Sequence, residues 1–376
     1  MKKTKICYVL SHSRPNYIRT QVLVDAMKLL DDYELVEARN KSKSIFRYIE
    51  TILKLIWIRI TENPDIYFLG FRAQDIYFPV RILTLGKPLI VDEFVVAYDS
   101  IIFEGKFERL GLRFRENGIV AKILYFYEKL MLKTADFLIT DTHLHKQLIT
   151  ELFPVEAGKI QAVPVGTNER YFNKENAAEI TERNKKDPFK VFYYGDIMKL
   201  HGFDILLKAI KILNERDLSI EYKLGIGNKQ KYVAKMEETV FGDETPDNVS
   251  IIGWIDGYDR IIDHMNTANL CVSGPLGATN QARRVIHGKT YQYLALGRPT
   301  VIGKIPYDYG FINKKNCLYV EQGDPEALAE LISWSYKHPH RLKKIGRNAR
   351  LLYEERFSNK VISEILAKVL ESAVNE

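Results

Sequence analysis

A cationic cluster in the second half of the sequence has the residue types and spacing that hold a diphosphate. Arg283 and Arg284 precede Gly288, Lys289 and Thr290, which open a predicted helix. Backbone N–H groups at a helix start attract an anion, and basic side chains beside them add to this attraction. The triplet Gly-Lys-Thr is shared with P-loops, but that motif needs a glycine where Arg283 stands. The pattern therefore predicts a diphosphate clamp of another kind, and the alternative is a solvated basic turn.

A second candidate loop lies earlier in the same half. Gly195 ends a β-rich run and Gly202 opens a predicted helix over 203–214, with Lys199 and His201 between them. A strand, a glycine-bounded basic loop and a helix start form a common arrangement for binding phosphate. The alternative is a plain turn in which the glycines serve tightness alone.

Two further features of this half are candidates for contact with a nucleotide. Gly225 and Gly227 follow a predicted strand, but the third glycine of the dinucleotide fingerprint is absent. Both close approach to a ligand and simple packing therefore stay open for these glycines. Trp254 follows another strand and offers a ring that could flank a base.

Polar residues in the first half also follow predicted strands, where an α/β fold binds its ligands. His12 and Arg14 follow the first strand, and Asp92 ends another, with Tyr98 and Asp99 just beyond it. We predict that Asp92 and Asp99 face an acceptor and take part in catalysis. His12, Arg14 and Tyr98 are predicted to bind that acceptor. A single such residue is more often a helix cap.

Composition argues against several other kinds of chemistry. The three cysteines are far apart, with no Cys/His ligand spacing, and no Asp-x-Asp triplet occurs. We therefore expect neither a metal nor a bound cofactor, and we expect the reducing cytoplasm as the location. The net charge of +7 suits a phosphorylated ligand or an anionic membrane. No nucleic-acid-binding signature accompanies it, so nucleic acid is not an expected partner.

The order of elements predicts two α/β domains with doubly wound parallel sheets. Short runs that are apolar throughout alternate with helix-length segments, as in a sheet covered on both faces. We predict a Rossmann-like domain over 1–175, a polar linker over 176–188, a second such domain over 189–355 and a helix over 356–376 that packs back on the first. Ligands are expected in the cleft between the domains. The predicted strands are 5–10, 65–70, 88–92, 136–140, 190–195, 220–224, 249–252, 270–273 and 299–302.

A basic stretch from Arg39 to Arg59 carries isoleucines at helical spacing. Its most apolar part, Ile49 to Ile60, is broken by Lys54 and Arg59 and is too short to span a bilayer. One interpretation is a helix packed on the sheet with a solvated outer face. The other is peripheral docking on an anionic membrane, which would bring the protein to a lipid-linked acceptor.

A series of motifs resembles the group 1 glycosyltransferases, family 4, which have the GT-B fold of two facing Rossmann-like domains. The resemblance extends over nearly the whole chain, and the order of its motifs is more specific than any one of them. In the second half it rests on Tyr194-Gly195 with the segment 201–209, and on the segments 224–227, 252–254, 289–301 and 323–329.

The resemblance implies a retaining, metal-independent transfer of a sugar from a nucleotide-diphosphate donor to a glycan or lipid-linked acceptor, as in polysaccharide biosynthesis. The second domain would hold the donor and the first the acceptor, and the leaving diphosphate would help to deprotonate the acceptor. Lys289 and Arg284 are then the expected catalytic cations. The expected donor-binding residues are Gly195, Lys199, His201, Gly202, Gly225, Gly227, Trp254, Arg283, Gly288, Thr290 and Gln292.

One departure from the family pattern leaves other functions open. The family has a pair of glutamates, one for the sugar hydroxyls and one for the ribose, and their places hold Arg284 and Gln292. A non-catalytic nucleotide-sugar-binding protein would bind the ligand without transfer. An epimerase of the same fold would release product without an acceptor.

Overall fold

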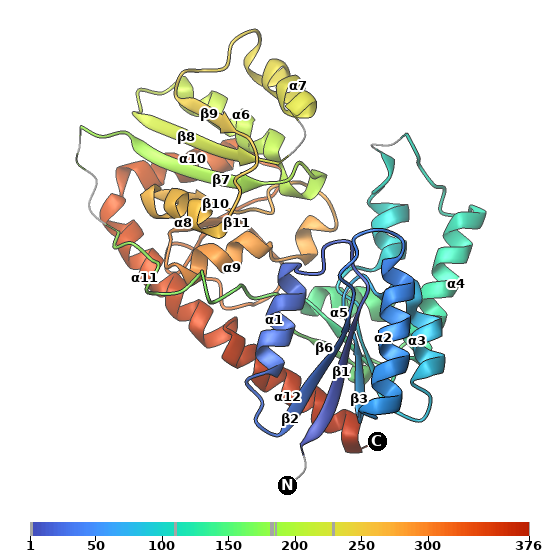
Figure 1. Ribbon diagram of the computed structural model, residues 1–376. Coiled ribbons are helices and arrows are strands. Elements are labelled where there is room, and N and C mark those ends of the chain that lie inside the picture. Colours follow the sequence, from blue (N-terminus) through green and yellow to red (C-terminus); the bar gives the residue numbers. More distant parts are fainter. Residues whose placement is uncertain (1–2, 109–110, 181–183, 185, 228–229, 376) are drawn as a thin grey trace. The chain divides into compact units, whose positions relative to one another are not determined.

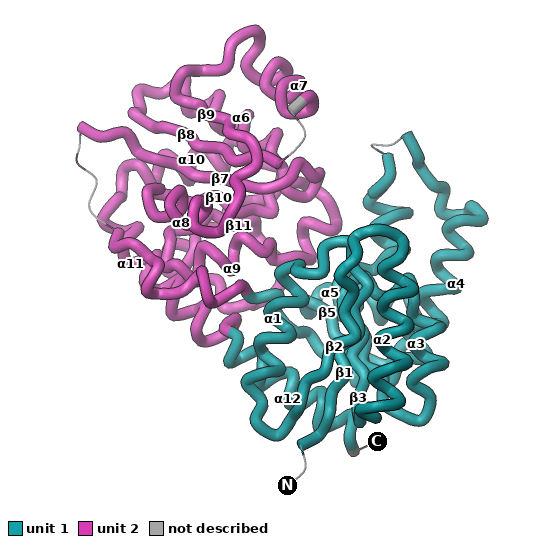
Figure 2. Tube along the Cα trace, in the orientation of Figure 1, with its two compact units in different colours: residues 1–166, 359–376 teal, residues 167–358 magenta. Residues whose placement is uncertain are grey.

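The chain folds into two compact units, which are described separately. The computed structural model describes residues 3–375 except 109–110, 181–183, 185 and 228–229. Unit 1 comprises residues 1–166 and 359–376, and unit 2 comprises residues 167–358 (Figure 2). The first segment of unit 1 thus ends at Gly166, earlier than the predicted 175. The predicted linker 176–188, part of which lies outside the described residues, falls within unit 2.

The sheet of unit 1 is parallel and has the strand order β2-β1-β3-β4-β5-β6 (Figure 1). The strands are β1 (Thr4–Leu10), β2 (Tyr33–Arg39), β3 (Ile66–Leu69), β4 (Leu89–Asp92), β5 (Phe137–Thr140) and β6 (Ile160–Ala162). The apolar runs predicted four of them. They did not predict β2, because this edge strand pairs with β1 alone and its residues are mostly only partly buried. They also did not predict β6, which has three residues.

Both faces of this sheet are covered. Successive residues of β3 enter opposite clusters: Ile66 and Phe68 join one, and Tyr67 and Leu69 join the other. This alternation follows from the two-residue period of a strand. Helices α1 (Ile18–Met27) and α12 (Asn359–Asn375) cover the first face. Helices α2 (Arg47–Thr61), α3 (Tyr77–Leu83), α4 (Ile119–Thr134) and α5 (His143–Leu152) cover the second.

The sheet of unit 2 is also parallel, with the order β12-β11-β10-β7-β8-β9. Its strands are β7 (Phe189–Gly195), β8 (Ile220–Ile226), β9 (Val249–Ile252), β10 (Leu270–Val272), β11 (Thr300–Gly303) and β12 (Leu318–Val320). Its helices are α6 (Phe203–Asn214), α7 (Gln230–Phe241), α8 (Tyr258–Thr267), α9 (Gly288–Ala295), α10 (Pro325–Lys337) and α11 (Pro339–Arg356). The chain thus builds the same kind of doubly wound domain twice, as the sequence predicts.

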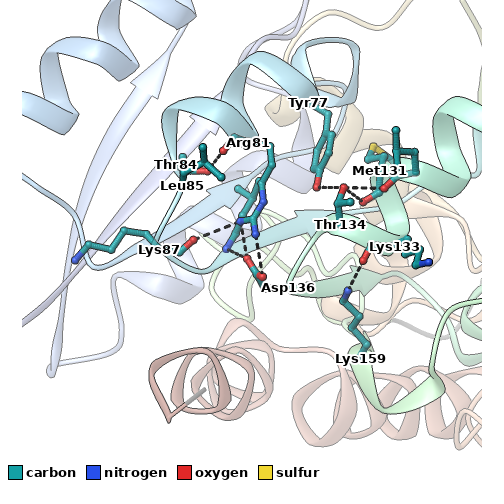
Figure 3. A network of polar contacts seen from close by, with 12 residues as sticks. Tyr77, Arg81, Thr84, Leu85, Lys87, Met131, Lys133, Thr134, Asp136 and Lys159 are labelled. Carbon is teal, nitrogen blue, oxygen red and sulfur yellow. Dashed lines mark hydrogen bonds and ion pairs between the residues drawn. The ribbon is translucent and has the colours of Figure 1, made fainter.

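A cavity of about 730 Å³ lies at the edge of the unit 1 sheet where the strands begin, opposite the edge formed by their carboxyl ends. Arg81 of α3 makes a two-pronged ion pair there with Asp136, at 2.8 and 3.2 Å, and donates to the carbonyl of Lys87 (Figure 3). Asp136 also accepts the backbone N–H of Leu89 at 2.7 Å. These contacts fasten α3 to the starts of β4 and β5. Since α/β sheets bind ligands at their carboxyl edge, we assign this cavity a structural role.

The C-terminal helix α12 belongs to the core of unit 1. Leu366 and Leu370 are fully buried in the cluster formed with β1, β3 and α1. We expect Leu366→Ala to lower the free energy of unfolding by about 2–5 kcal/mol, because it leaves a cavity between helix and sheet. Urea unfolding followed by circular dichroism measures this. Leu53→Ala on the exposed side of α2 is the matched control, and equal effects of the two changes would contradict the packing.

Candidate active site

The strand order of unit 2 reverses between β7 and β10, and the candidate residues of this unit gather there. The chain leaves β7 through the loop 196–202 into α6, and it leaves β10 through Ser273 toward α9. At such a reversal the two loops diverge to opposite faces and open a crevice, which is where α/β sheets bind ligands. The fold therefore positions this site, and its chemistry depends on the side chains around it.

Lys289 is held at the end of β7. Its ammonium lies 3.7 Å from the ring centre of Tyr193 and donates to the carbonyl of Tyr194 at 3.1 Å. Burial lowers its pKa well below the ordinary lysine value, and the charge of Asp196 opposes this shift only in part. A side chain added at Gly195 would place its Cβ 3.3 Å from Nζ. The glycine therefore leaves open an approach to a cation that the protein has desolvated.

Two histidines stand beside this lysine. The rings of His201 and His287 are 4.5 Å apart and edge-to-face, and His201 Nδ1 lies 2.5 Å from the carbonyl oxygen of Asp196. Burial lowers the pKa of His287 well below its ordinary value, and the charges of His201 and Lys289 lower it further. Three basic groups thus crowd one crevice, and a bound anion would favour their protonated forms.

Glycines bring the two loops into backbone contact. Gly202 has φ +63°, and a Cβ there would lie 2.4 Å from the backbone nitrogen of Gly277. Gly277 in turn donates its N–H to the carbonyl of Leu200 at 3.1 Å. Any side chain at these positions would separate the loops, so Gly202 shapes the site through packing. Gly225 has a similar role, because a Cβ there would lie 2.6 Å from Ile255.

The rim of the site carries a ring and a carboxylate. A Cβ at Gly227 would lie 2.6 Å from Asp196 Oδ1 and 3.2 Å from the ring of Trp254. The Trp254 side chain is 60% exposed. An exposed ring beside a glycine at a strand end suits stacking on a nucleotide base. Its part in nucleotide binding stays a prediction.

The other residues predicted to bind the sugar donor lie partly on the surface and partly inside the protein. Gly288 begins α9 in open space, and Arg283 and Lys199 are exposed. Arg284 is half-buried on the short 3₁₀ turn Ala282–Arg284 that precedes α9. Two residues of α9 are turned into the protein. Thr290 shares a hydrogen bond of 2.6 Å with Ser273, and Gln292 accepts the hydroxyl hydrogen of Tyr194. Thr290 was expected to offer a donor to the ligand, and instead its hydroxyl fastens α9 to β10.

Comparison with protein families decides the identity of this unit. Residues 188–338 match the model of the family described as glycosyl transferases group 1. Unit 2 is a glycosyl transferases group 1 domain. The resemblance read from the sequence motifs is thereby confirmed, and the chain is a glycosyltransferase. The comparison with curated proteins found no match.

Solved structures identify the fold of the whole glycosyltransferase as GT-B. A glycosyltransferase from Rickettsia africae is similar at TM-score 0.69 and 15% identity, with 100% of this chain and 99% of that chain covered. Sucrose-phosphate synthase from Thermosynechococcus elongatus gives TM-score 0.73 at 13% identity, covering 98% and 99%. HepE from Anabaena, in complex with UDP, gives 0.68 at 12%, covering 98% and 100%. The predicted fold class is thus confirmed.

In unit 1 of the glycosyltransferase, the structure gives Asp92 a role other than the predicted one. Both of its carboxylate oxygens accept hydrogen bonds from Arg19 at 3.1 Å, and neither side chain is exposed. Burial lowers the pKa of Arg19, but the charge and hydrogen bonds of Asp92 outweigh burial and leave it raised. Arg19 also donates to the carbonyls of Val163 and Pro164 at 2.7 and 2.9 Å. The prediction that Asp92 faces an acceptor is therefore wrong: it anchors α1 to the sheet.

Neighbouring acidic side chains at this edge are also held inside the protein. Burial, with the adjacent carboxyl of Glu128, raises the pKa of Glu93 well above its ordinary value. Glu128 accepts the backbone N–H groups of Ala97 and Tyr98 at 2.6 and 2.8 Å. Asp141 lies 2.5 Å from the ring nitrogen of His145. These groups stabilise the loops after β4 and β5.

Tyr98 and Asp99 lie among these loops rather than beside His12 and Arg14. The Tyr98 ring packs edge-on against Phe103 and Tyr125, each at 5.5 Å, on the core below the sheet. Asp99 is 5% exposed at the start of a π-helical turn. Tyr98 is only partly buried and lies away from the cavity of His12, so its expected part in binding the acceptor stays a prediction.

His12 and Arg14 share a cavity of about 470 Å³ with residues that the sequence analysis did not single out. The new members are Arg47 from the start of α2, and Arg72 and Asp75 from the loop after β3. The sequence did offer a signal for these residues, because their loop follows a buried strand, as the other polar clusters do. The signal was missed because Phe71 extends the apolar run of that strand into the loop.

We expect Asp92→Asn to destabilise the protein, because it leaves the buried Arg19 charge without its counter-charge. The expected loss is about 3–5 kcal/mol in the free energy of unfolding. Urea unfolding measures it, with Asp31→Asn on the exposed turn before β2 as the control. If unfolding were unchanged while glycosyl transfer was lost, Asp92 would be a catalytic base after all.

Proposed function

We propose that the chain is a retaining, metal-independent glycosyltransferase that moves a sugar from a nucleotide-diphosphate donor to a glycan or lipid-linked acceptor. The observation that carries this proposal is the group of Lys289, His201 and His287 around Gly195, at the strand-order reversal of the group 1 domain. A diphosphate is the part of such a donor that requires this concentration of positive charge.

The chemistry of transfer supports this choice of ligand. As the bond to the sugar breaks, negative charge develops on the leaving diphosphate, and fixed cations in a water-poor crevice stabilise it. Lys289 is already desolvated, and α9 begins at the neighbouring Gly288 in open space, so the N–H groups of this helix start would add to the attraction for an anion. Cations in these positions supply the neutralisation that a metal ion supplies in other transferases. Arg283, Arg284 and Lys199 would complete the clamp.

Similar solved structures support a nucleotide sugar as the donor. HepE from Anabaena has been solved with UDP-glucose, and it resembles this chain along nearly its whole length. The base of such a donor would stack in this chain on Trp254 beside Gly227.

Retention rests on the family resemblance and on one structural observation. The ion pair with Arg19 occupies Asp92, one of the two carboxylates, with Asp99, that the sequence offered on the acceptor side. In the family that the chain resembles, the leaving diphosphate acts as the base, on the same face of the sugar that it departs from. This order of events gives a product with the anomeric configuration of the donor.

We expect Lys289→Met to lower turnover about 100-fold or more, because it removes a charge that stabilises the leaving group while keeping the volume of the stem. Release of nucleoside diphosphate from UDP-glucose, GDP-mannose and ADP-glucose measures turnover with and without candidate acceptors. Lys211→Met, on the exposed side of α6, is the matched control. Unchanged turnover in the Lys289 variant would reject the clamp, and binding without any turnover in the wild type would indicate a non-catalytic protein.

Proton exchange gives a second readout of the same clamp. Because burial holds the pKa of Lys289 down, a bound diphosphate that raises it again must draw in a proton. The affinity for the nucleoside diphosphate should therefore fall as the pH rises into the alkaline range. Calorimetry in buffers of different ionisation enthalpy measures the uptake, which Lys289→Met should abolish and Lys211→Met should leave.

An exposed apolar face on unit 1 supports a peripheral position on the cytoplasmic side of a membrane. The outer side chains of α2 are 60–77% exposed and apolar: Ile49, Leu53, Trp57 and Ile60. Helix α4 carries a similar row: Ile119, Ile123, Phe126 and Leu130. Between them lies α3, which contacts α2 and joins α4 through the rings of Phe78 and Tyr127 at 5.1 Å (Figure 1).

Charge complementarity points to an anionic lipid surface as the partner of this face. Helix α4 carries Lys122, Lys129 and Lys133, while its acidic residue, Glu128, is buried. Rows of apolar side chains flanked by lysines are typical of helices that lie in a membrane interface. No helix in the described part of the chain is long and apolar enough to cross a bilayer.

We expect the protein to sediment with phosphatidylcholine vesicles that contain phosphatidylglycerol, and much less with phosphatidylcholine alone. The double variant Leu53→Gln, Trp57→Gln should weaken this binding by at least about tenfold, because it removes two large apolar anchors. Leu351→Gln, on the exposed side of α11, controls for a general loss of surface apolarity. Equal binding by all three proteins would contradict docking through this face.

A further inference from the structure

The cavity of His12 and Arg14 lies where the strand order of unit 1 reverses. The order β2-β1-β3 turns back between β1 and β3, and the cavity is lined by the loop after β1 and the loop after β3. By the rule for α/β sheets, this crevice is the expected ligand site of unit 1. Since both loops belong to the same unit, the site is complete within it.

Positive charge dominates this cavity. Three arginines line it, Arg14, Arg47 and Arg72, against the single carboxylate of Asp75. That carboxylate accepts the hydroxyl hydrogen of Tyr48 at 2.8 Å. Burial lowers the pKa of His12, and the charges of the three arginines lower it further. The arginines therefore act on one point, and an anion placed there would be attracted by all of them.

Hydrogen bonds fix the loop that presents the donors of this cavity. Asn40 bonds both backbone groups of His12, accepting its N–H at 3.0 Å and donating to its carbonyl at 2.8 Å. The Nδ1 atom of His12 lies 2.7 Å from the backbone nitrogen of Arg14 and 2.8 Å from its carbonyl oxygen, so the loop itself engages this ring nitrogen and holds the ring in place. Ser11 lines the same cavity with a fully buried hydroxyl that has no partner among the described residues.

Backbone strain marks the other side of the cavity. Arg72 has φ +69°, a left-handed conformation that costs a residue with a side chain about 1 kcal/mol. It places the guanidinium 5.5 Å from the ring centre of Phe71. Strain held in a loop with a charged, exposed side chain is typical of ligand sites.

We propose that this cavity binds a phosphate or diphosphate group carried by the acceptor, held by Arg14, Arg47 and Arg72 beside the ring of His12. Guanidinium groups bind phosphate oxygens in pairs, which suits an anion with several oxygens. Together with the proposed function, on which this inference rests, it makes the acceptor a phosphorylated molecule and the cavity its anchoring site.

The source of the phosphate is either a lipid-linked headgroup or a soluble phosphate ester. The lipid source is favoured by Arg47, because it begins α2 and follows Ile45 and Phe46, which are 71% and 67% exposed. A lipid chain leaving the cavity past this helix start would meet the apolar face of α2.

The first test measures the affinity of the full chain for inorganic pyrophosphate by calorimetry. It uses a Lys289→Met background so that the donor clamp contributes less. The double change Arg14→Gln, Arg72→Gln should weaken pyrophosphate binding by at least about tenfold, since two charge-assisted contacts are lost. Arg113→Gln, an exposed arginine of the same unit, should leave it unchanged. Equal affinities for pyrophosphate in all three proteins, the Lys289→Met parent and its two derivatives, would overturn the proposal.

The second test separates the two sources and the two proposals. A lipid source predicts that polyprenyl phosphate in vesicles retains the wild type better than phosphatidylglycerol of equal charge, and that Arg14→Gln, Arg72→Gln removes this preference. A soluble source predicts competition by sugar phosphates without a vesicle preference. With an intact donor site, the same variant should lose transfer yet keep slow hydrolysis of the donor. Absence of both hydrolysis and transfer from the wild type, with the pyrophosphate binding retained, would refute the proposed function and leave the anion site standing.

Discussion

Each sheet reverses its strand order once, and this reversal determines where the unit has room for a ligand. Where a parallel sheet winds in both directions from one strand, two adjacent loops must leave toward opposite faces, and the space between them cannot be filled by either. Unit 2 reverses between β7 and β10, and unit 1 between β1 and β3. In each unit the basic side chains singled out above surround that place. Topology thus decides where the charges act before any ligand is present.

Like charges held close together without a bound anion destabilise the protein, and the two units reduce this repulsion in different ways. In unit 2 the crevice buries Lys289 against the face of Tyr193, where a lowered pKa lets the lysine shed its proton. In unit 1 the arginines cannot lose their charge, so they stay exposed to water or stack on rings, as Arg47 does on Tyr48 at 4.2 Å. A lysine suits the enclosed site and arginines the open one.

The sequence predicted the elements that are apolar throughout and the motifs that begin or end them. The helix over 203–214 and the turn at Gly202 agree with the structure because a strand, a glycine and an amphipathic run leave little choice. The prediction from sequence failed for β2, whose half-buried residues lack a continuous apolar run. It also failed for Asp92, since position after a strand is shared by ligand-binding and structural carboxylates. Only the distant Arg19 tells them apart, and no local pattern reveals a contact across 73 residues.

The fate of the acidic residues constrains the chemistry as strongly as the position of the basic ones. Asp92, Glu93 and Asp141 end β4 and β5, where a catalytic carboxylate would be expected, and each is engaged with Arg19, Glu128 or His145. Since their hydrogen bonds maintain the loops, using one as a base would require breaking the packing that forms the site. A reaction that takes its base from the leaving group avoids this conflict. It asks the protein only for basic groups that are charged when the diphosphate is bound, and both strand-order reversals supply such groups.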